Sequence, residues 1–424
     1  MIEFAGKWAT TLVGIVLTAG AAQAQAQEVI PGQNVADRSH PEYDPVPIAF
    51  GAFSFLPTTT VRLTATDNYR ARAVDPQSDA YVSIRPAATL RSNWARHRLE
   101  VDGFYEQRIH FKLSDENSNS IGTTLRGLYD ISRQTQLTAD LSARSDVESR
   151  SALGSFRGTA EPVRYNSFRG SVGLSQSFND LQLTGRGGYD KIDFRDAKIA
   201  AGGKIDQDFR DYERISLGGN ANYSLRNGIG LVGGLQYDKT NYNFGPGSAG
   251  FVPGVNRVRD SSGVSAQAGV SLELTRLIFG TIQAGYISRR YEDARLRDVN
   301  GFSFSADVLW NPTPLTSVTV RAGRSIEESA STVFSGNTRT DFNVRVDHEL
   351  YRYVLISGDL EYSHFRANGP GPRGDEYAAA AAVRYLVDRR FTVLGSLRHQ
   401  RRTSNVAGLR YDATSATIGL RIAF

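Results

Sequence analysis

The chain has 424 residues, of which 41 are glycine, none is cysteine and 40% are hydrophobic. The lack of cysteine excludes disulfides and cysteine-based zinc motifs, and at a mean hydropathy of -0.34 no segment beyond the N-terminal apolar run is apolar for long enough to form a transmembrane helix. Lysine and arginine number 49 against 44 acidic residues, a formal net charge of +5, and this small excess permits a mild preference for anions without requiring one.

The N-terminus has the pattern of a secretory signal peptide. Lys7 precedes an apolar run at residues 8–22 that ends in two overlapping Ala-Gln-Ala steps. We expect a signal peptide at residues 1–26, cleaved after Ala24 or Ala26. A retained anchor helix is the alternative, and it is disfavoured because threonine and glycine leave the run too short and too polar to span a membrane.

Hydrophobicity alternates with a period of two along many segments, which indicates β-strands. The clearest is the last segment, whose apolar face carries Ile418, Leu420, Ile422 and Phe424 and whose polar face carries Thr417, Gly419 and Arg421. The same alternation recurs at residues 215–223, 264–274 and 342–347. No segment shows a convincing helical period, so we expect no helical domain.

The connections between these segments alternate strictly between short and long, as in outer-membrane barrels, which have short periplasmic turns and longer extracellular loops. Short turns are predicted at residues 132–134, 178–180, 226–228, 275–277, 351–353 and 388–390. Long loops are predicted at residues 112–119, 150–162, 196–208, 245–257, 292–300, 331–338 and 368–374. The strongest hairpin signal is Asn227-Gly228. Both chain ends then lie in the periplasm.

These patterns predict an all-β fold, a transmembrane antiparallel up-and-down β-barrel of roughly eighteen strands, or sixteen if two short runs are loops. We expect a periplasmic pre-barrel segment at residues 27–47 and the barrel at residues 48–424. Aromatic residues near strand ends would form interfacial girdles, and Phe424, at the end of the closing strand, is the predicted assembly signal. A soluble β-sandwich or β-solenoid is the alternative, but the length and the lack of a repeat disfavour it.

Six short motifs carry a resemblance to a known family. They are HPEYDPVPI at residues 40–48, DN at 67–68, LRSNWARH at 90–97, WNPTPLT at 310–316, DHEL at 347–350 and QRRTSN at 400–405. With them the chain resembles the proteobacterial outer-membrane family called beta-barrel porin 2 over nearly all its mature length. The resemblance implies a barrel in the outer membrane, in a family whose members are often encoded with exopolysaccharide synthesis and export systems. It supplies no catalytic or binding residues.

A barrel of this width leaves an aqueous lumen unless it is plugged, so function is expected to depend on the inward-facing side chains. The pore-lining candidates are Arg85, Arg126, Arg144, Arg186, Arg289, Arg321, Arg345, Arg384, Arg398, Arg421, Glu273, Asp307 and Asp359. They form either a wall of mutually satisfied ion pairs or an arginine ladder that selects anions. Phe104 and Phe279 also point inward, but no continuous aromatic track is present.

No catalytic or metal-binding pattern is evident, so we do not expect an enzyme, a cofactor or a bound metal. The six histidines lack metal-ligand spacing, His110 and His364 are expected to be solvated at extracellular strand ends, and there is no G-x-S-x-G motif. A Ser/His/Asp site on the barrel wall stays open, because such triads are recognised by geometry.

We therefore expect an outer-membrane channel for export of an exopolysaccharide or for passage of polar or anionic solutes. The alternative is a structural or receptor barrel plugged by its own segments, for which residues 245–257 and 28–47 are the candidates. Expected partners are outer-membrane lipid and lipopolysaccharide and the barrel-assembly machinery, with a polysaccharide-export complex as a further candidate and no nucleic acid.

Overall fold

The computed structural model describes residues 32–155, 158–199, 202–225, 228–248, 250–327 and 336–424. The chain divides into Met1–Ile30 and Pro31–Phe424, and all described residues belong to the second unit. The predicted signal peptide at residues 1–26 lies outside the described residues. Within them, no helix has both the length and the apolar character needed to span a bilayer.

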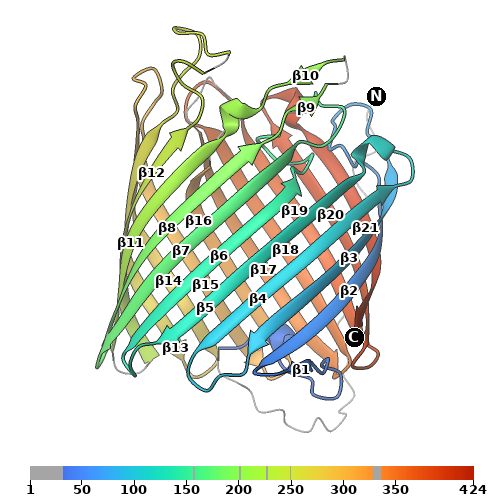
Figure 1. Ribbon diagram of the computed structural model, residues 1–424, viewed down its shortest axis with the longest axis vertical. Coiled ribbons are helices and arrows are strands. Elements are labelled where there is room, and N and C mark those ends of the chain that lie inside the picture. The colour runs from blue at the N-terminus through green and yellow to red at the C-terminus, as the bar shows by residue number, and fades with distance from the viewer. Residues whose placement is uncertain (1–31, 156–157, 200–201, 226–227, 249, 328–335) are drawn as a thin grey trace, which may run out of the picture. The chain divides into compact units, whose positions relative to one another are not determined.

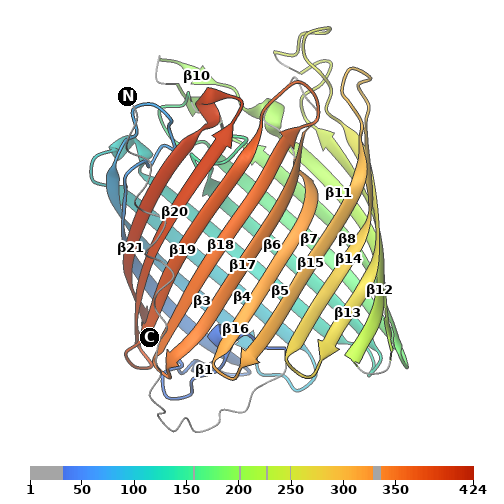
Figure 2. The same cartoon turned by 180° about the vertical axis from the view of Figure 1, so that it is seen from behind.

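The described residues of the second unit form a closed antiparallel barrel of 18 strands (Figures 1 and 2). Its strands are β2 (Phe53–Thr66), β3 (Asp79–Ser92), β4 (Arg98–His110), β5 (Ser118–Asp130), β6 (Thr135–Val147), β7 (Arg164–Phe178), β8 (Leu181–Phe194), β11 (Tyr212–Ser224), β12 (Ile229–Tyr242), β13 (Ser261–Leu274), β14 (Ile278–Tyr291), β15 (Val299–Thr313), β16 (Thr316–Glu327), β17 (Asn337–Tyr351), β18 (Val354–Ala367), β19 (Arg373–Leu386), β20 (Phe391–Ser404) and β21 (Tyr411–Ala423). Each strand pairs with the next along the chain, and β21 pairs with β2 to close the barrel. The fold prediction is confirmed, with eighteen strands rather than sixteen.

Short turns join the strands at one end of the barrel and long loops join them at the other (Figure 1). Asn179, Thr275 and Arg276 have positive φ angles of 50°, 53° and 58° in such turns, the backbone conformation that tight hairpins require. Gly228 also has positive φ, 73°, whereas Arg226 and Asn227 of the same predicted turn lie outside the described residues. By the rule for outer-membrane barrels, the turn end faces the periplasm.

Small elements decorate both ends of the barrel. They are η1 (Val35–Asp37), β1 (Ile48–Phe50), η2 (Ser114–Glu116), β9 (Ala197–Lys198), β10 (Lys204–Ile205), η3 (Asp208–Arg210) and η5 (Ala407–Leu409). The first two belong to the segment that precedes the barrel, and β1 pairs with the start of β2. The others lie in the long loops, where β9 and β10 form a two-stranded sheet of their own.

The two faces of the barrel wall differ in the way that the alternation predicts. Aliphatic side chains such as Leu217, Leu235 and Leu360 are exposed on the outer face, as expected for side chains in contact with lipid. An aromatic ladder also runs across this face, with neighbouring ring centroids 5.3–6.3 Å apart. It consists of Phe302 and Phe304 on β15, Phe342 on β17, Tyr362 on β18 and Tyr377 on β19. The inner face is polar and charged.

Candidate functional site

The strand register places all thirteen predicted pore-lining residues on the polar face of the wall. For example, Arg421 pairs with Thr60, which pairs with Arg85, and Arg345 pairs with Asp359. Residues paired across neighbouring strands project to the same side. The set therefore shares one surface, and its role in lining an open pore stays a prediction.

Many of the lumen charges form ion pairs on hydrated parts of the wall. Arg126 on β5 contacts Glu100 and Asp102 at 2.8 and 2.6 Å, and Arg321 on β16 contacts Asp307 at 3.2 Å. The Arg126 and Arg321 side chains are nevertheless 52% and 61% exposed. Because they point into the barrel, this exposure shows that the lumen is hollow beside them. Such exposed pairs each contribute at most about 1 kcal/mol to stability.

Three inward arginines near the turn end form no ion pair with a carboxylate among the described residues. Within the described residues, Arg62 and Arg421 make no ion pair, and Arg384 donates a hydrogen bond of 2.5 Å to the carbonyl oxygen of Ala36. Arg62 pairs across the sheet with Gly419, where a β-carbon would come within 2.9 Å of the arginine Cγ, so the glycine leaves room for the long side chain. These three residues, the mouth arginines, create a local excess of positive charge.

The segment before the barrel lies against the inner wall at the turn end, where both views show η1 within the barrel outline (Figures 1 and 2). Val35, fully buried, donates its backbone N–H to Ser317 Oγ at 2.7 Å. Asn34 Nδ2 donates to Asp347 Oδ2 at 2.9 Å, and Asp347 is only 1% exposed. Residues 32–47 thus line one sector of the periplasmic mouth, formed by β16 and β17.

Further contacts bring together motifs from distant parts of the sequence. His40 Nε2 lies 3.5 Å from Glu349 Oε2, and both side chains are buried. Arg38 donates a hydrogen bond to the carbonyl oxygen of Pro314. Sequence reasoning missed these contacts, but it had a signal, because the motifs at residues 40–48, 310–316 and 347–350 all contribute to this one interface.

The extracellular mouth is narrowed by the loop between β6 and β7. Arg150 in this loop contacts Glu116 of η2 at 2.9 Å, and the glutamate is fully buried. Glu148 at its start contacts Arg210 of η3 at 2.5 Å, and the carbonyl oxygen of Ser151 accepts a hydrogen bond of 2.5 Å from Arg402 on β20. The described part of residues 148–163 therefore connects loops and strands from different sectors of the barrel rim.

The loop at residues 245–257, a candidate plug under the alternative of a closed barrel, does not enter the lumen in its described part. It follows β12 and rises above the barrel (Figure 1), and Val252 and Val255 are exposed. Its partner is the neighbouring loop, since Arg295 donates to the Gly254 carbonyl oxygen at 2.9 Å and Arg257 donates to the Arg295 carbonyl oxygen at 2.8 Å. The loop that narrows the mouth is instead the one at residues 148–163.

The histidine expectations have a mixed outcome. His110 is buried, not solvated: its Nδ1 lies 2.8 Å from Asp79 Oδ2, and its ring stacks on Tyr81. Its Nε2 is also enclosed, so the ring packs the wall and is closed to a substrate. His364 is 45% exposed and lies 2.9 Å from Asp375 on the outer face.

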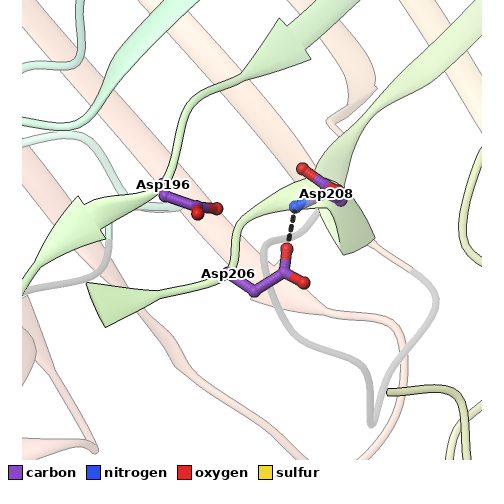
Figure 3. A group of neighbouring side chains, drawn as sticks. All are labelled: Asp196, Asp206 and Asp208. Atoms are coloured by element: carbon purple, nitrogen blue, oxygen red, sulfur yellow. Dashed lines mark hydrogen bonds between the residues drawn. The ribbon is translucent and has the colours of Figure 1, made fainter. Parts of the chain in front are cut away.

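One group of acids lies close enough to share a cation, in the loop between β8 and β11 (Figure 3). Ligand oxygens of Asp196, Asp206 and Asp208 lie within 4.8 Å of one another, and all three residues are exposed. The Asp208 backbone N–H donates to Asp206 Oδ1 at 2.8 Å. Partial burial and the neighbouring negative charges raise the pKa of Asp208. Exposed carboxylates of this kind are common without an ion.

A closed barrel with an apolar outer face and a charged, hollow lumen is a transmembrane β-barrel of the porin type. The chain belongs to the family described as "Putative beta-barrel porin 2", whose model matches residues 40–424. This confirms the resemblance seen in the sequence and the location in the outer membrane. No curated protein matches the chain.

Several solved structures are similar to the chain at low sequence identity. OpdL of Pseudomonas aeruginosa has 11% identity and a TM-score of 0.46, covering 88% of this chain and 99% of that one. OpdK of the same organism has 12% identity and a TM-score of 0.43, with coverage of 87% and 99%. The siderophore receptor PirA, also from Pseudomonas aeruginosa, has 9% identity and a TM-score of 0.46, with coverage of 87% and 80%. All three similarities are remote.

Proposed function

We propose that this porin-family barrel is a water-filled channel that passes small polar solutes and prefers anions weakly. The observation that carries the proposal is the group of mouth arginines. Other lumen arginines, such as Arg126 and Arg398, are compensated by nearby acids, so their fields largely cancel. The mouth arginines form no ion pair among the described residues, and the one carboxylate that lines a cavity with Arg62 and Arg384, that of Asp37, leaves an excess of positive charge that would attract anions at one end of the pore.

Because both mouths of the barrel are narrowed, we favour small solutes over a polymer as the transported substrate. Residues 32–47 occupy part of the periplasmic mouth, and the loop at residues 148–163 reaches across the extracellular rim through Arg150 and Ser151. Phe104 lies under the guanidinium of Arg85, 3.9 Å from the ring centroid to Cζ, and Phe279 packs beside Gly32. The two rings are far apart along the wall and one of them is stacked on a guanidinium, so they form no continuous aromatic track to guide a sugar chain.

Planar-bilayer recordings under a potassium chloride gradient test the proposal. We expect the full chain to conduct, with chloride favoured over potassium by about two- to threefold. The variant R62Q/R384Q/R421Q should lose this preference, and R321A/R398A, which leaves Asp307 and Glu361 uncompensated, should shift it toward cations. Lys191→Gln, on the outer face, is the matched control and should leave the preference unchanged.

A variant that lacks residues 28–47 distinguishes a barrel whose lumen is closed from one whose periplasmic mouth is only narrowed. We expect this deletion to raise conductance, because it opens one sector of the periplasmic mouth. If neither the full chain nor the deletion conducts, the channel proposal is wrong and a structural or receptor barrel replaces it. Conduction with no ion preference in any variant would show that the arginines are scaffold.

A further inference from the structure

Four arginines gather on the outer face of β18–β20 and the adjoining loop, at the extracellular rim. They are Arg366 on β18, Arg373 on β19, Arg401 on β20 and Arg410 just before β21. All four are exposed. The strand register places Arg366, Arg373 and Arg401 on the side opposite the buried, inward-facing Arg402 and Glu376, and therefore toward the membrane. We call this group the rim arginines.

The rim arginines lack the carboxylate partners that lumen arginines have. Among the described residues, Arg366, Arg373 and Arg401 make no side-chain hydrogen bond or ion pair, and Arg410 donates only to the carbonyl oxygen of Ser404, at 2.6 Å. Arg366 and Arg373 stand directly opposite each other across the sheet. Like charges in this position destabilise a strand pair, so a bound anion between them would relieve a real repulsion.

The nearby acids do not fill this role. Asp375 lies 2.9 Å from His364 Nδ1 and accepts a hydrogen bond of 2.9 Å from Tyr362. Asp412 stands opposite Arg401 across the sheet, but it makes its ion-pair contact with His399 Nε2, at 3.6 Å, and none with Arg401. Both carboxylates are therefore engaged by neutral or weakly basic neighbours, and the guanidinium groups keep their donors free.

Some cations on the same outer face are paired, whereas Arg290 on β14 and Arg324 on β16 also face outward without an ion pair among the described residues. Lys191 on β8 lies 2.8 Å from Glu213, and Lys239 on β12 lies 3.8 Å from Glu292. What distinguishes the β18–β20 sector is that four such arginines lie on neighbouring strands and the adjoining loop, whereas Arg290 and Arg324 are isolated on theirs.

The surroundings of the rim arginines fit an amphiphile. A groove of about 970 Å³ is lined by Arg72 and Pro76 of the loop after β2 together with Arg373, Arg401 and Arg410, and also by Asp375 and Asp412. On the membrane side of the arginines, the aromatic ladder ends in Tyr362 and Tyr377, and Arg401 pairs directly with Tyr377. Interfacial aromatic rings of this kind lie at the level of lipid headgroups.

We propose that the rim arginines bind the phosphate groups of a phosphorylated glycolipid in the outer leaflet, with its acyl chains along the aromatic ladder. Guanidinium groups bind phosphate through two parallel hydrogen bonds, which makes arginine well suited to this ligand. The position at the membrane surface favours a lipid over a free phosphate ion. The site is independent of the channel, so it stands or falls separately from the proposed transport function.

Native mass spectrometry of the full-length barrel in detergent tests the site with three probes: bisphosphorylated lipid A, its dephosphorylated form and inorganic phosphate. We expect retention of lipid A only when it is phosphorylated. The variant R366Q/R373Q/R401Q should weaken this binding by at least about tenfold, the equivalent of one or two charge-assisted hydrogen bonds. The matched control K191Q/K239Q, which removes paired cations from the same outer face, should bind as the unaltered chain does.

Three results would overturn the proposal. Equal retention of dephosphorylated lipid would show that acyl packing alone binds it, and displacement by inorganic phosphate would identify a plain anion site. Unchanged binding by R366Q/R373Q/R401Q would place the lipid elsewhere. If that variant fails to fold, two measurements still test the proposal. One is whether the unaltered chain distinguishes the two lipids. The other is whether R366K/R373K/R401K, which keeps the charges but not the paired donors, binds phosphorylated lipid A more weakly.

Discussion

Arg401 and Arg402 are neighbours in the sequence, yet they experience opposite environments. Arg402 points into the barrel, is 4% exposed and contacts Glu376, which also binds Arg339 at 2.8 Å. Arg401 points outward, is exposed, and has no charged partner among the described residues. The strand alternation alone assigns one arginine to a compensated network and the other to the membrane surface.

This comparison explains why overall charge says little about such a protein. The formal net charge of +5 is a sum over three different regions: a lumen whose charges are largely paired, the mouth arginines, and a rim with unpaired positive charge. Each population has a different chemical role, because a charge acts through its partners and its solvent exposure. Position on one face of a strand is therefore more informative than composition.

The largest effect on barrel assembly is expected from a change at the closing strand pair, β2 and β21, because closure of the barrel separates its inner face from its outer face. Phe424 follows β21, donates its backbone N–H to the Pro57 carbonyl oxygen at 3.2 Å and exposes its ring at the turn end. Deleting Phe424 should sharply reduce the folded barrel in the outer membrane, because the closing strand loses its interfacial anchor. The readout is the fraction of protein whose gel mobility changes on boiling. Phe424→Tyr should assemble normally, and normal insertion of the deletion would remove this role from Phe424.

The next effect compares the two arginine environments directly. Glu376→Gln should destabilise the barrel by about 3 kcal/mol, because it leaves the buried Arg402 and the partly buried Arg339 without their shared carboxylate. Arg401→Gln, in lipid-free detergent, should change stability by less than about 0.5 kcal/mol, as for other exposed sites. Urea unfolding of both variants measures the difference. Equal loss of stability would show that the outward arginine is also part of a structural network.

A smaller effect is expected on the pH dependence of loop stability, where two aspartates with opposite pKa shifts can be compared. Burial, with nearby negative charges, raises the pKa of Asp211 to about 6, whereas the hydrogen-bonded Arg295 lowers the pKa of Asp293 to about 2. The folded state binds the Asp211 proton more tightly than the unfolded state does, so the stability of the loop before β11 should fall as pH rises from about 4 to about 6. The stabilisation from Asp293 is complete above about pH 4 and is lost only toward pH 2.

Hydrogen exchange at about pH 4.5 and about pH 7.5, corrected for the intrinsic rate, tests this contrast. Protection of residues 202–211 should decrease at the higher pH, while protection of residues 292–298 should stay constant. Asp211→Asn should abolish the change, because the amide can still accept the 2.6 Å hydrogen bond from the Phe194 N–H without a buried charge. A change that persists in this variant would assign it to another group.

The barrel could be predicted from the sequence because alternation and turn length are local properties. Residues 417–424 show both faces of a strand by themselves, and the turn at residues 275–277 lies where the sequence placed it. The folding of loops and of the pre-barrel segment is a different matter. The contact between Arg150 and Glu116, or between Asn34 and Asp347, depends on where long connections settle inside a closed cylinder, which no local pattern encodes.

The same limit applies to the candidate sites. Alternation places Arg384 and Arg398 on the inner face, but only the three-dimensional arrangement shows that Arg398 contacts Glu361 at 2.7 Å while Arg384 contacts a backbone carbonyl. The rim arginines escaped notice because inward residues were expected to carry the function. Their signal was present in the motif at residues 400–405, where two consecutive arginines must face opposite sides of the wall.

The docking of the pre-barrel segment imposes an order on assembly. Val35 and Ser317 are 282 residues apart in the chain, so the segment before the barrel finds its partners on strands that are synthesised much later. Before β16 and β17 have paired, the site on β17 to which Asn34 binds has not formed. Asp347, which is buried in the finished barrel, is then still in contact with water. Docking of residues 32–47 is therefore a late event, and a chain in which this segment is protected from protease has already paired β16 with β17.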